Sequence, residues 1–366
     1  MHCPCCGTHV RPPNSKLFHR RGTAEPPRLH GVPLILAIES SCDETAVALL
    51  RGEPGRAASV LASVVASQIE LHRQFGGVVP ELASRNHSLH LHALVEQSLR
   101  QAAVKVRDID AFAATTGPGL ASSLLIGSTA AKALACASQR PFLAINHLEG
   151  HLLSPFVGET QVPPHLALIV SGGHTLLLDV AGAGRYIKLG GTRDDAVGEA
   201  FDKVGKMLNL PYPGGPEIEI LALDGNPTAY AFPRSMLHDG HLDFSFSGLK
   251  TAVLYTLQRE AGSACPADVA ASFQQAVIDI LVGKSLAAAH HCGRRKVALS
   301  GGVSLNQALR EAFTQACGRA GLELVLATPS LCTDNAAMIG FAALLRHLAG
   351  ESSPLDGDIH PHLPFV

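Results

Sequence analysis

The stretch of sequence that decides the fold is residues 34–50, which read LILAIESSCDETAVALL. Apolar runs on both sides of a polar turn, residues 39–45, predict two buried strands joined as a hairpin. Two adjacent carboxylates, Asp43 and Glu44, stand at the tip of this turn. Carboxylates at such a tip are either solvated or face a metal ion or phosphate in a cleft, and the residues alone leave both interpretations open.

A second stretch of the same shape occurs at residues 165–180, which read HLALIVSGGHTLLLDV. Another glycine turn, residues 300–306, follows the apolar run at 296–299. Glycine turns after buried strands present backbone amides that can bind anions. The repetition predicts an α/β protein with two lobes of similar plan and a ligand cleft between them.

The composition fits a folded protein of two lobes. A chain of 366 residues with 46% apolar and 16% charged residues is typical of a well-buried globular protein. The net charge of −2 means that any RNA-binding surface must be a local basic patch. No apolar run is long enough for a membrane span and the start lacks the apolar core of a signal peptide, so we expect a cytoplasmic protein.

Composition shifts along the chain predict four segments. These are a flexible N-terminal tail at 1–33, a first lobe at 34–150, a second lobe at 151–333, and, at 334–366, a helix that returns to the first lobe and a tail. Three of the nine cysteines, Cys3, Cys5 and Cys6, crowd the N-terminal tail. Their spacing does not fit the CxxC pairs of a zinc knuckle, and their role is not predicted.

A candidate metal site lies in residues 146–151, which read NHLEGH. Asn146 and Glu149 have the form of a capping box, which would place His147 in the first turn of a helix and His151 on the same face. Two imidazoles on one face can share a metal ion, but 19 histidines give roughly one such spacing by chance. Asp334, in a polar turn near the other end of the chain, strengthens the hypothesis of a site built from distant segments.

A denser histidine cluster lies on the helix predicted at 82–103. It contains His87, His90 and His92. On a helix His87 and His90 would share a face and His92 would turn away, and no carboxylate pattern accompanies them. We expect these side chains to pack at a surface or an interface.

Ten short motifs occur together in the order of one known family. They are ESSCDETAVAL, GGVVPELASRNH, TTGPGL, HLEGH, VSGGHT, GEAFDKVGKML, YPGGP, DFSFSGLKT, SGGVSLN and CTDNAAM. From about residue 34 to 348 the chain resembles the TsaD (Gcp, YgjD) family of tRNA threonylcarbamoyladenosine synthases, once described as O-sialoglycoprotein endopeptidases. The joint set of motifs is highly specific, although no single motif is.

The resemblance implies both a fold and an activity. The fold would be the two-lobed actin-like ATPase, sugar kinase and chaperone ATPase fold, with duplicated RNase H-like lobes and an interlobe cleft. The activity would be transfer of a threonylcarbamoyl group from L-threonylcarbamoyladenylate to the N6 amine of the adenosine 3′ of the anticodon, in tRNAs reading codons that begin with A. The resemblance also implies a TsaB-like paralogue and a TsaE-like ATPase as partners.

By the same resemblance, His147, His151 and Asp334 would hold one divalent metal ion, with iron(II) favoured over zinc. Asp43 and Glu44 match a family motif near the metal. Our hypothesis is that one of these two carboxylates acts as a general base toward the amine.

Motif matching also implies a set of residues that bind the adenylate. They are Ile169, Val170, Ser171, Gly172, Gly173, Asp202, Gly215, Glu219 and Asn306. Glycine amides can hold a phosphate and carboxylates can hold ribose hydroxyls. Glu219 stands where aspartate is common in the family, which would lengthen a ribose contact by one methylene.

Three other functions match parts of the pattern. Metalloproteases of the HExxH type place the glutamate one residue after the first histidine, whereas Glu149 comes two residues after His147 and would point away from the pair. A sugar kinase or chaperone-like ATPase would share the fold, but such kinases use Mg²⁺ held by oxygen ligands. A regulatory paralogue that only scaffolds a complex would be expected to lose the metal ligands, which this chain retains.

Overall fold

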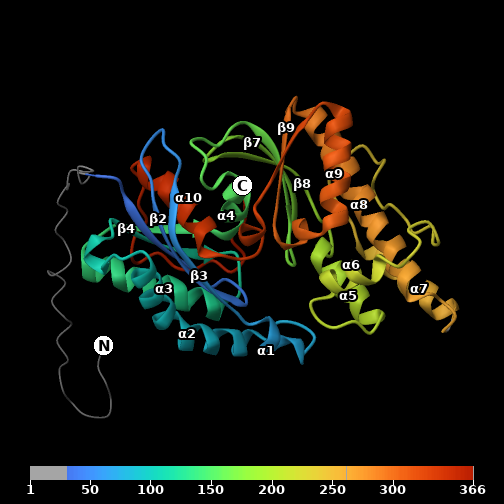
Figure 1. Cartoon of the computed structure of the whole chain (residues 1–366), viewed down its shortest axis with the longest axis horizontal. Helices are drawn as coiled ribbons and strands as arrows, with labels where there is room; N and C mark the ends of the chain where they lie inside the picture. Colours follow the sequence, from blue (N-terminus) through green and yellow to red (C-terminus); the bar gives the residue numbers. More distant parts are fainter. Residues whose placement is uncertain (1–30, 261, 366) are drawn as a thin grey trace, which may run out of the picture. The chain divides into compact units, whose positions relative to one another are not determined.

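The computed structural model describes residues 31–260 and 262–365. Nearly all of the predicted N-terminal tail, with Cys3, Cys5 and Cys6, lies outside the described residues. The described chain contains two five-stranded sheets with helices packed against them (Figure 1). This confirms the prediction of an α/β fold built on two similar sheets.

The first sheet has the strand order β3-β2-β1-β4-β5. Its strands are β1 (Leu34–Glu39), β2 (Glu44–Arg51), β3 (Ser59–Ser67), β4 (Ala111–Gly117) and β5 (Phe142–Asn146). As predicted, β1 and β2 form an antiparallel hairpin, and β4 and β5 run parallel to β1. Alternate residues of β1 join different hydrophobic clusters, Ile35 one and Leu36 the other. A strand covered on both faces explains the continuous apolar run.

Helices cover both faces of this sheet. They are α2 (Pro80–Gln101), α3 (Ala121–Ser138) and, from the other end of the chain, α10 (Ala336–Leu348). The same half of the chain also contains α1 (Ile69–Arg73) and the short η1 (Val106–Asp108). The cluster with Leu36 includes residues of α2 and α3, and the cluster with Ile35 includes residues of α10. The C-terminal helix therefore packs on the first sheet, in contact with β1 and β2.

The second sheet repeats the first in the order β8-β7-β6-β9-β10. Its strands are β6 (His165–Val170), β7 (Thr175–Gly182), β8 (Arg185–Gly191), β9 (Lys296–Ser300) and β10 (Glu323–Leu326). Here too the hairpin β6-β7 and the strand β8 are antiparallel, while β9 and β10 run parallel to β6. In both sheets, therefore, the first three strands in chain order pair antiparallel with one another, and the last two run parallel to the first.

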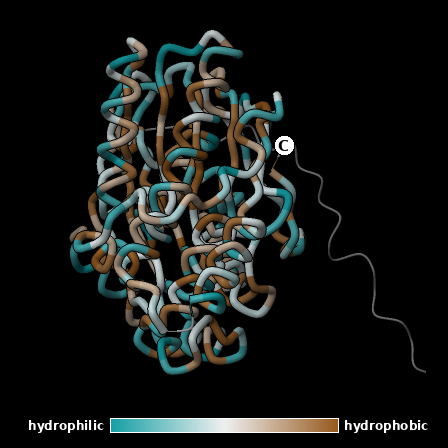
Figure 2. The backbone as a smooth tube through the Cα atoms, turned by 90° about the vertical axis from the view of Figure 1, so that its right-hand side faces the viewer, coloured by the Kyte–Doolittle hydropathy of each residue, from teal (hydrophilic) through white to brown (hydrophobic). Residues whose placement is uncertain are grey.

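The remaining helices lie around or between the sheets. They are α4 (His147–Leu153), η2 (Ser154–Phe156), α5 (Val197–Met207), α6 (Gly214–Ala222), α7 (Ser247–Arg259), α8 (Pro266–His291), η3 (Gly302–Leu305), α9 (Gln307–Ala320) and η4 (Pro329–Leu331). Figure 2 shows that hydrophobic and hydrophilic stretches alternate along the backbone of the described chain. Residues 212–216, which the sequence suggests are a loop, already begin α6 at Gly214. Although α8 is long, no helix in the described ranges is long and apolar enough to cross a membrane.

The proline-rich C-terminal segment, which the sequence suggests is a tail, packs against the first half of the chain. Ser353 forms an isolated bridge with Phe142 of β5. Further on, the His360 amide donates to the Thr116 carbonyl at 2.8 Å. These bonds hold residues 349–365 against the ends of β4 and β5.

Candidate metal centre and adjoining cavity

The two candidate histidines lie one turn apart on α4. Asn146 caps this helix by accepting a hydrogen bond from the Leu148 amide at 2.9 Å. The ring centroids of His147 and His151 are consequently only 4.7 Å apart. The predicted capping box is wrong in its second half, because the Glu149 carboxylate turns away from the cap and accepts hydrogen bonds from Arg346 and Tyr186.

Asp334 completes the group from the turn before α10. Its Oδ1 atom lies 3.0 Å from Nε2 of His151 and 3.4 Å from Nε2 of His147. Ligand atoms each ~2.1 Å from one ion are about 3.0–3.4 Å apart in octahedral or tetrahedral geometry. Burial would raise the pKa of Asp334, but the charges of His147 and His151 hold it well below its usual range. The residues therefore offer an ionised carboxylate and two imidazoles at the spacing that one metal ion requires.

Glu39, at the end of β1, orients His147. Its Oε2 atom lies 3.2 Å from Nδ1 of His147 and accepts a hydrogen bond from Thr115 at 2.5 Å. Such a carboxylate fixes the ring so that the other nitrogen faces the ligand position. Burial lowers the pKa of His147, but Asp334 and Glu39 outweigh it and raise that pKa to about 9, so a bound metal ion would displace the Nε2 proton.

Sequence reasoning missed Glu39 because it assigned this residue to the polar turn. The available signal was a charged residue directly continuing an apolar strand. Glu39 is fully buried. A buried carboxylate needs partners that stabilise its charge, and a neighbouring imidazole is such a partner.

The tip of the first hairpin is held by His87 of α2. The Nε2 atom of His87 lies 3.0 Å from the Cys42 carbonyl oxygen, and Nδ1 lies 2.7 Å from the Thr45 hydroxyl. His87 therefore fixes the residues on both sides of Asp43 and Glu44. The expectation of a surface or interface position is wrong for His87, which is fully buried.

Glu44 differs from an ordinary surface carboxylate. It accepts a hydrogen bond from the Ser67 hydroxyl at 3.2 Å. Burial, together with the charges of Asp43 and Asp334, raises the pKa of Glu44 to about 10. That Asp43 and Glu44 lie near a bound metal ion stays a prediction from the family motif.

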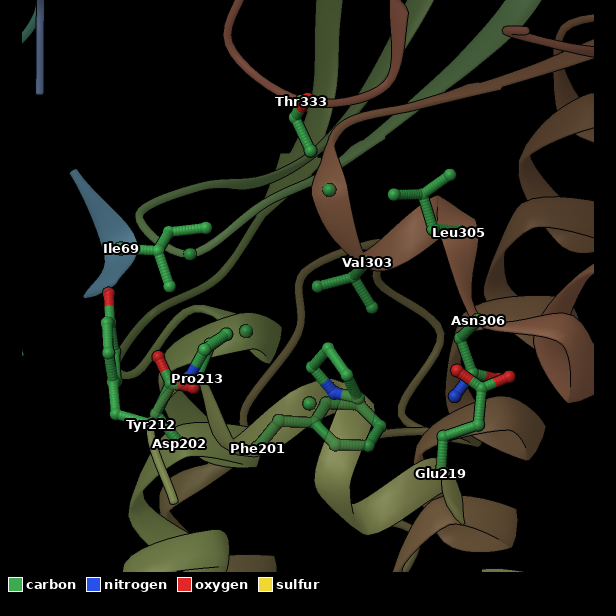
Figure 3. A pocket seen from close by; sticks show the side chains of 15 residues that line it. Ile69, Phe201, Asp202, Tyr212, Pro213, Glu219, Val303, Leu305, Asn306 and Thr333 are labelled. Atoms are coloured by element: carbon green, nitrogen blue, oxygen red, sulfur yellow. The ribbon is translucent and has the colours of Figure 1, made fainter. Parts of the chain in front are cut away.

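A cavity of about 280 Å³ has Thr333, the residue before Asp334, in its wall (Figure 3). Ile69 lines it from the first half of the chain, and Thr333, next to Asp334, lines it from the turn before α10. Five of the predicted adenylate-binding residues line it: Gly172, Asp202, Gly215, Glu219 and Asn306. The other four, Ile169, Val170, Ser171 and Gly173, are not among its lining residues, and Ile169 and Val170 are fully buried in β6.

The polar side chains of the cavity are fixed by backbone amides. Asp202 accepts from the Gly214 amide at 2.7 Å, and burial raises its pKa to about 6 although these amides oppose the shift. Asn306 caps α9, and its amide donates to Gln274 at 2.7 Å, a partner that sequence reasoning missed. Glu219 lies beside Asn306 in Figure 3 and accepts from the first amide of α9 at 2.5 Å.

Sequence comparison places the chain in a family. The sequence model described as "TsaD: tRNA N6-adenosine threonylcarbamoyltransferase" matches residues 59–341. The chain belongs to the TsaD family. A tRNA N6-adenosine threonylcarbamoyltransferase of an Acidovorax species is 50% identical over 340 residues, covering 91% of this chain and 97% of that protein. The protein of the same description from Desulfitobacterium hafniense is 48% identical, covering 90% and 96%.

Solved structures agree with TsaD membership at the level of the fold. HypF of T. kodakarensis matches with a TM-score of 0.61 and 14% identity, over 87% of this chain and 48% of HypF. Component A of (R)-2-hydroxyglutaryl-CoA dehydratase from Acidaminococcus fermentans matches with a TM-score of 0.51 and 14% identity, over 86% and 98%. The predicted two-lobed actin-like ATPase fold is thereby confirmed. The resemblance to the TsaD family is confirmed by the sequence match alone.

Proposed function

We propose that this chain transfers a threonylcarbamoyl group from L-threonylcarbamoyladenylate to the N6 amine of the adenosine 3′ of the anticodon in tRNAs reading codons that begin with A. Relatives that are tRNA N6-adenosine threonylcarbamoyltransferases share half of its residues over nearly their whole length. The observation that carries the proposal is that one turn joins the two parts of the site. Thr333 lines the cavity, and Asp334 belongs to the group with His147 and His151.

For the metal, we propose one divalent ion per chain on His147, His151 and Asp334, with iron(II) in preference to zinc. Two imidazoles and one carboxylate are the ligand set of many non-haem iron(II) sites, and three protein ligands leave coordination positions for substrate. A bound ion would supply Lewis-acid polarisation of the carbonyl that is attacked.

The residues of the cavity would position the adenylate. Such an adenylate is an activated mixed anhydride, so orientation and stabilisation of developing charge are the main requirements. Asp202 faces the cavity and suits a ribose hydroxyl, while Gly172 and Gly215 allow a phosphate to approach the backbone closely. Attack forms the N6–C bond, breaks the C–O bond to the phosphate and releases a proton together with AMP.

We further propose that the acceptor of this proton is one of the two carboxylates at the tip of the first hairpin, Asp43 or Glu44. Unchanged turnover numbers in both Asp43→Asn and Glu44→Gln would contradict this assignment.

A peptidase is disfavoured by the position of Glu149. Both oxygens of this carboxylate already have partners, Tyr186 at 3.0 Å and Arg346 at 2.6 Å. A peptidase glutamate has to reach a metal-bound water. The role of Glu149 is therefore structural.

The test is incorporation of labelled threonine into a tRNA that reads codons beginning with A. The assay supplies tRNA, an adenylate-forming enzyme, a TsaB-like paralogue and a TsaE-like ATPase, which we propose as partners. We expect wild type to modify the tRNA, and His147→Ala and Asp334→Ala to fail while remaining folded. If the wild type were inactive with all partners present but phosphorylated a sugar or hydrolysed ATP, the function would have to be reassigned.

A further inference from the structure

The structure contains a second cavity, of about 410 Å³. Its walls come from four places: the loop after β4, α4, the β7-β8 region and the C-terminal segment. Its lining includes six residues with apolar, aromatic or basic side chains: Leu148, His174, Leu176, Lys188, His362 and Phe365. None of these six residues lines the first cavity.

The C-terminal wall of this second cavity is a fixed part of the fold. The Gly119 amide donates to the Pro361 carbonyl at 3.1 Å. A Cβ atom at Gly117 would lie 2.1 Å from the His360 carbonyl oxygen, so only glycine allows this close approach. At the far end the Phe365 ring stacks on Tyr186 of β8, with centroids 5.5 Å apart. The segment therefore bridges the loops of the first sheet and a strand of the second.

Each cavity is lined by a residue that is next to a metal ligand in the chain. Leu148, which lines the second cavity, directly follows His147, just as Thr333 of the first cavity directly precedes Asp334. The β6-β7 turn also serves both, since Gly172 lines the first cavity and His174 the second.

The two cavities differ in charge. The first carries the carboxylates of Asp202 and Glu219, which would repel a polyanion. Among the described residues that line the second cavity there is no carboxylate, and Lys188 and His362 are exposed at its rim. Leu148, Leu176 and Phe365 add an apolar wall. Apolar and aromatic surface beside a cation is the combination that binds a base together with its phosphates.

We propose that the second cavity is the subsite for the acceptor nucleotide. The nucleobase would lie against the apolar wall with its exocyclic amine toward the metal-ligand group, and Lys188 and His362 would contact the flanking phosphates. This inference rests on the proposed function, because it concerns the acceptor of the same transfer. Donor and acceptor thus approach one centre from separate cavities.

The test compares two variants of the subsite with a charge control, in the complete assay with all partners. Lys188→Glu reverses the rim charge, and Phe365→Ala removes the aromatic wall. The control, Arg319→Glu, reverses an exposed charge on α9 that lines neither cavity. For each protein we would measure the KM for tRNA at several salt concentrations, the Kd for a non-hydrolysable adenylate analogue, and the metal content.

We expect Lys188→Glu to raise the KM for tRNA about tenfold and to reduce its salt dependence. Phe365→Ala should raise this KM by at least about fivefold, the lower end of what one stacked base contributes. The Kd for the adenylate analogue and the metal content should stay at their wild-type values in both variants. Arg319→Glu should match wild type throughout.

The subsite assignment is overturned if both variants bind tRNA as the control does, or if they weaken adenylate binding instead. Failure of the proposed function has a different signature, since wild type itself would then transfer nothing. A loss of activity through unfolding is recognised by the adenylate Kd, which would rise together with the KM for tRNA.

Discussion

The contact between Glu149 and Arg346 should control how tightly the chain binds a metal ion. Glu149 lies on α4 between the two histidine ligands, and Arg346 lies on α10, which begins just after Asp334. Their side chains meet at 2.6 Å, and the Tyr186 hydroxyl donates to the other carboxylate oxygen at 3.0 Å. The pair thus joins the two elements that carry the three ligands.

The expected effect follows from the exposure of the two partners. The Glu149 side chain is 3% exposed and that of Arg346 is 35% exposed. Breaking a fully buried pair costs about 3–5 kcal/mol. Because water reaches Arg346 and burial already raises the pKa of Glu149, the carboxyl left by Arg346→Met can take up a proton, and we expect a loss of only about 2 kcal/mol in the free energy of unfolding. Displacing α4 relative to α10 changes the spacing of the histidines from Asp334, and we expect metal binding to weaken about 10-fold, the lower end of the effect of losing a direct hydrogen-bond partner of a ligand.

The assay is a metal titration against a chelator of known affinity, alongside denaturant unfolding of the metal-free protein. Glu149→Gln and Arg346→Met are compared with Glu96→Gln, which breaks an exposed pair with Arg100 on α2. We expect the control to change stability by at most about 0.5 kcal/mol and metal affinity not at all. Unaltered metal affinity in Glu149→Gln, with reduced stability, would refute the positioning argument and leave the pair a purely structural contact.

Four further outcomes are expected. Burial lowers the pKa of His165 to about 4, so below pH 6.5 the unfolded chain binds a proton that the folded chain does not. The contribution of His165 to the free energy of unfolding should therefore fall by about 3 kcal/mol between pH 7 and pH 4. In His165→Asn, the free energy of unfolding measured with denaturant should lack this part of the pH dependence. Gly150→Ala would place a Cβ 2.8 Å from the Ile339 Cδ1 atom, and we expect a lower unfolding temperature and weaker metal binding in the same titration. Glu39→Gln should weaken metal binding about 10-fold or more, because the glutamine no longer orients the His147 ring as the carboxylate does. A metal affinity equal to that of wild type would contradict this role. Removing metal from wild type with a chelator should lower its unfolding temperature, whereas the Asp334→Ala variant should not respond.

The sequence predicted the strands better than the helices, for a physical reason. Strands β1 and β6 are covered on both faces and therefore read as unbroken apolar runs. By contrast, α8 has buried residues around most of its circumference, so it shows no narrow apolar stripe and sequence reasoning did not predict it. The repeated hairpin pattern predicted two similar sheets correctly, because each hairpin begins with a strand that is buried along its whole length.

Sequence reasoning predicted those features of the site that depend on residues close together in the chain. It did not predict hydrogen bonds between residues that are far apart in the chain. The spacing of His147 and His151 gave their common face, since one helix turn sets it. The partner of Glu149 could not be read from spacing, because Arg346 is 197 residues away and an equally sound local pattern, the capping box, suggested another partner. The partners of Glu39, which the sequence analysis assigned to the polar turn, are distant in the same way: Thr115 lies on β4 and His147 on α4.

The ligand residues lie where the chain crosses between the two sheets. Helix α4 connects β5 of the first sheet with β6 of the second, and it carries His147 and His151. The turn with Asp334 takes the chain from the second sheet back to α10, which packs on the first. A metal ion bound by all three residues would therefore join both crossings, so its affinity depends on how the two halves are held together. This explains why a contact such as that of Glu149 with Arg346, which touches no ligand atom, should still affect metal binding.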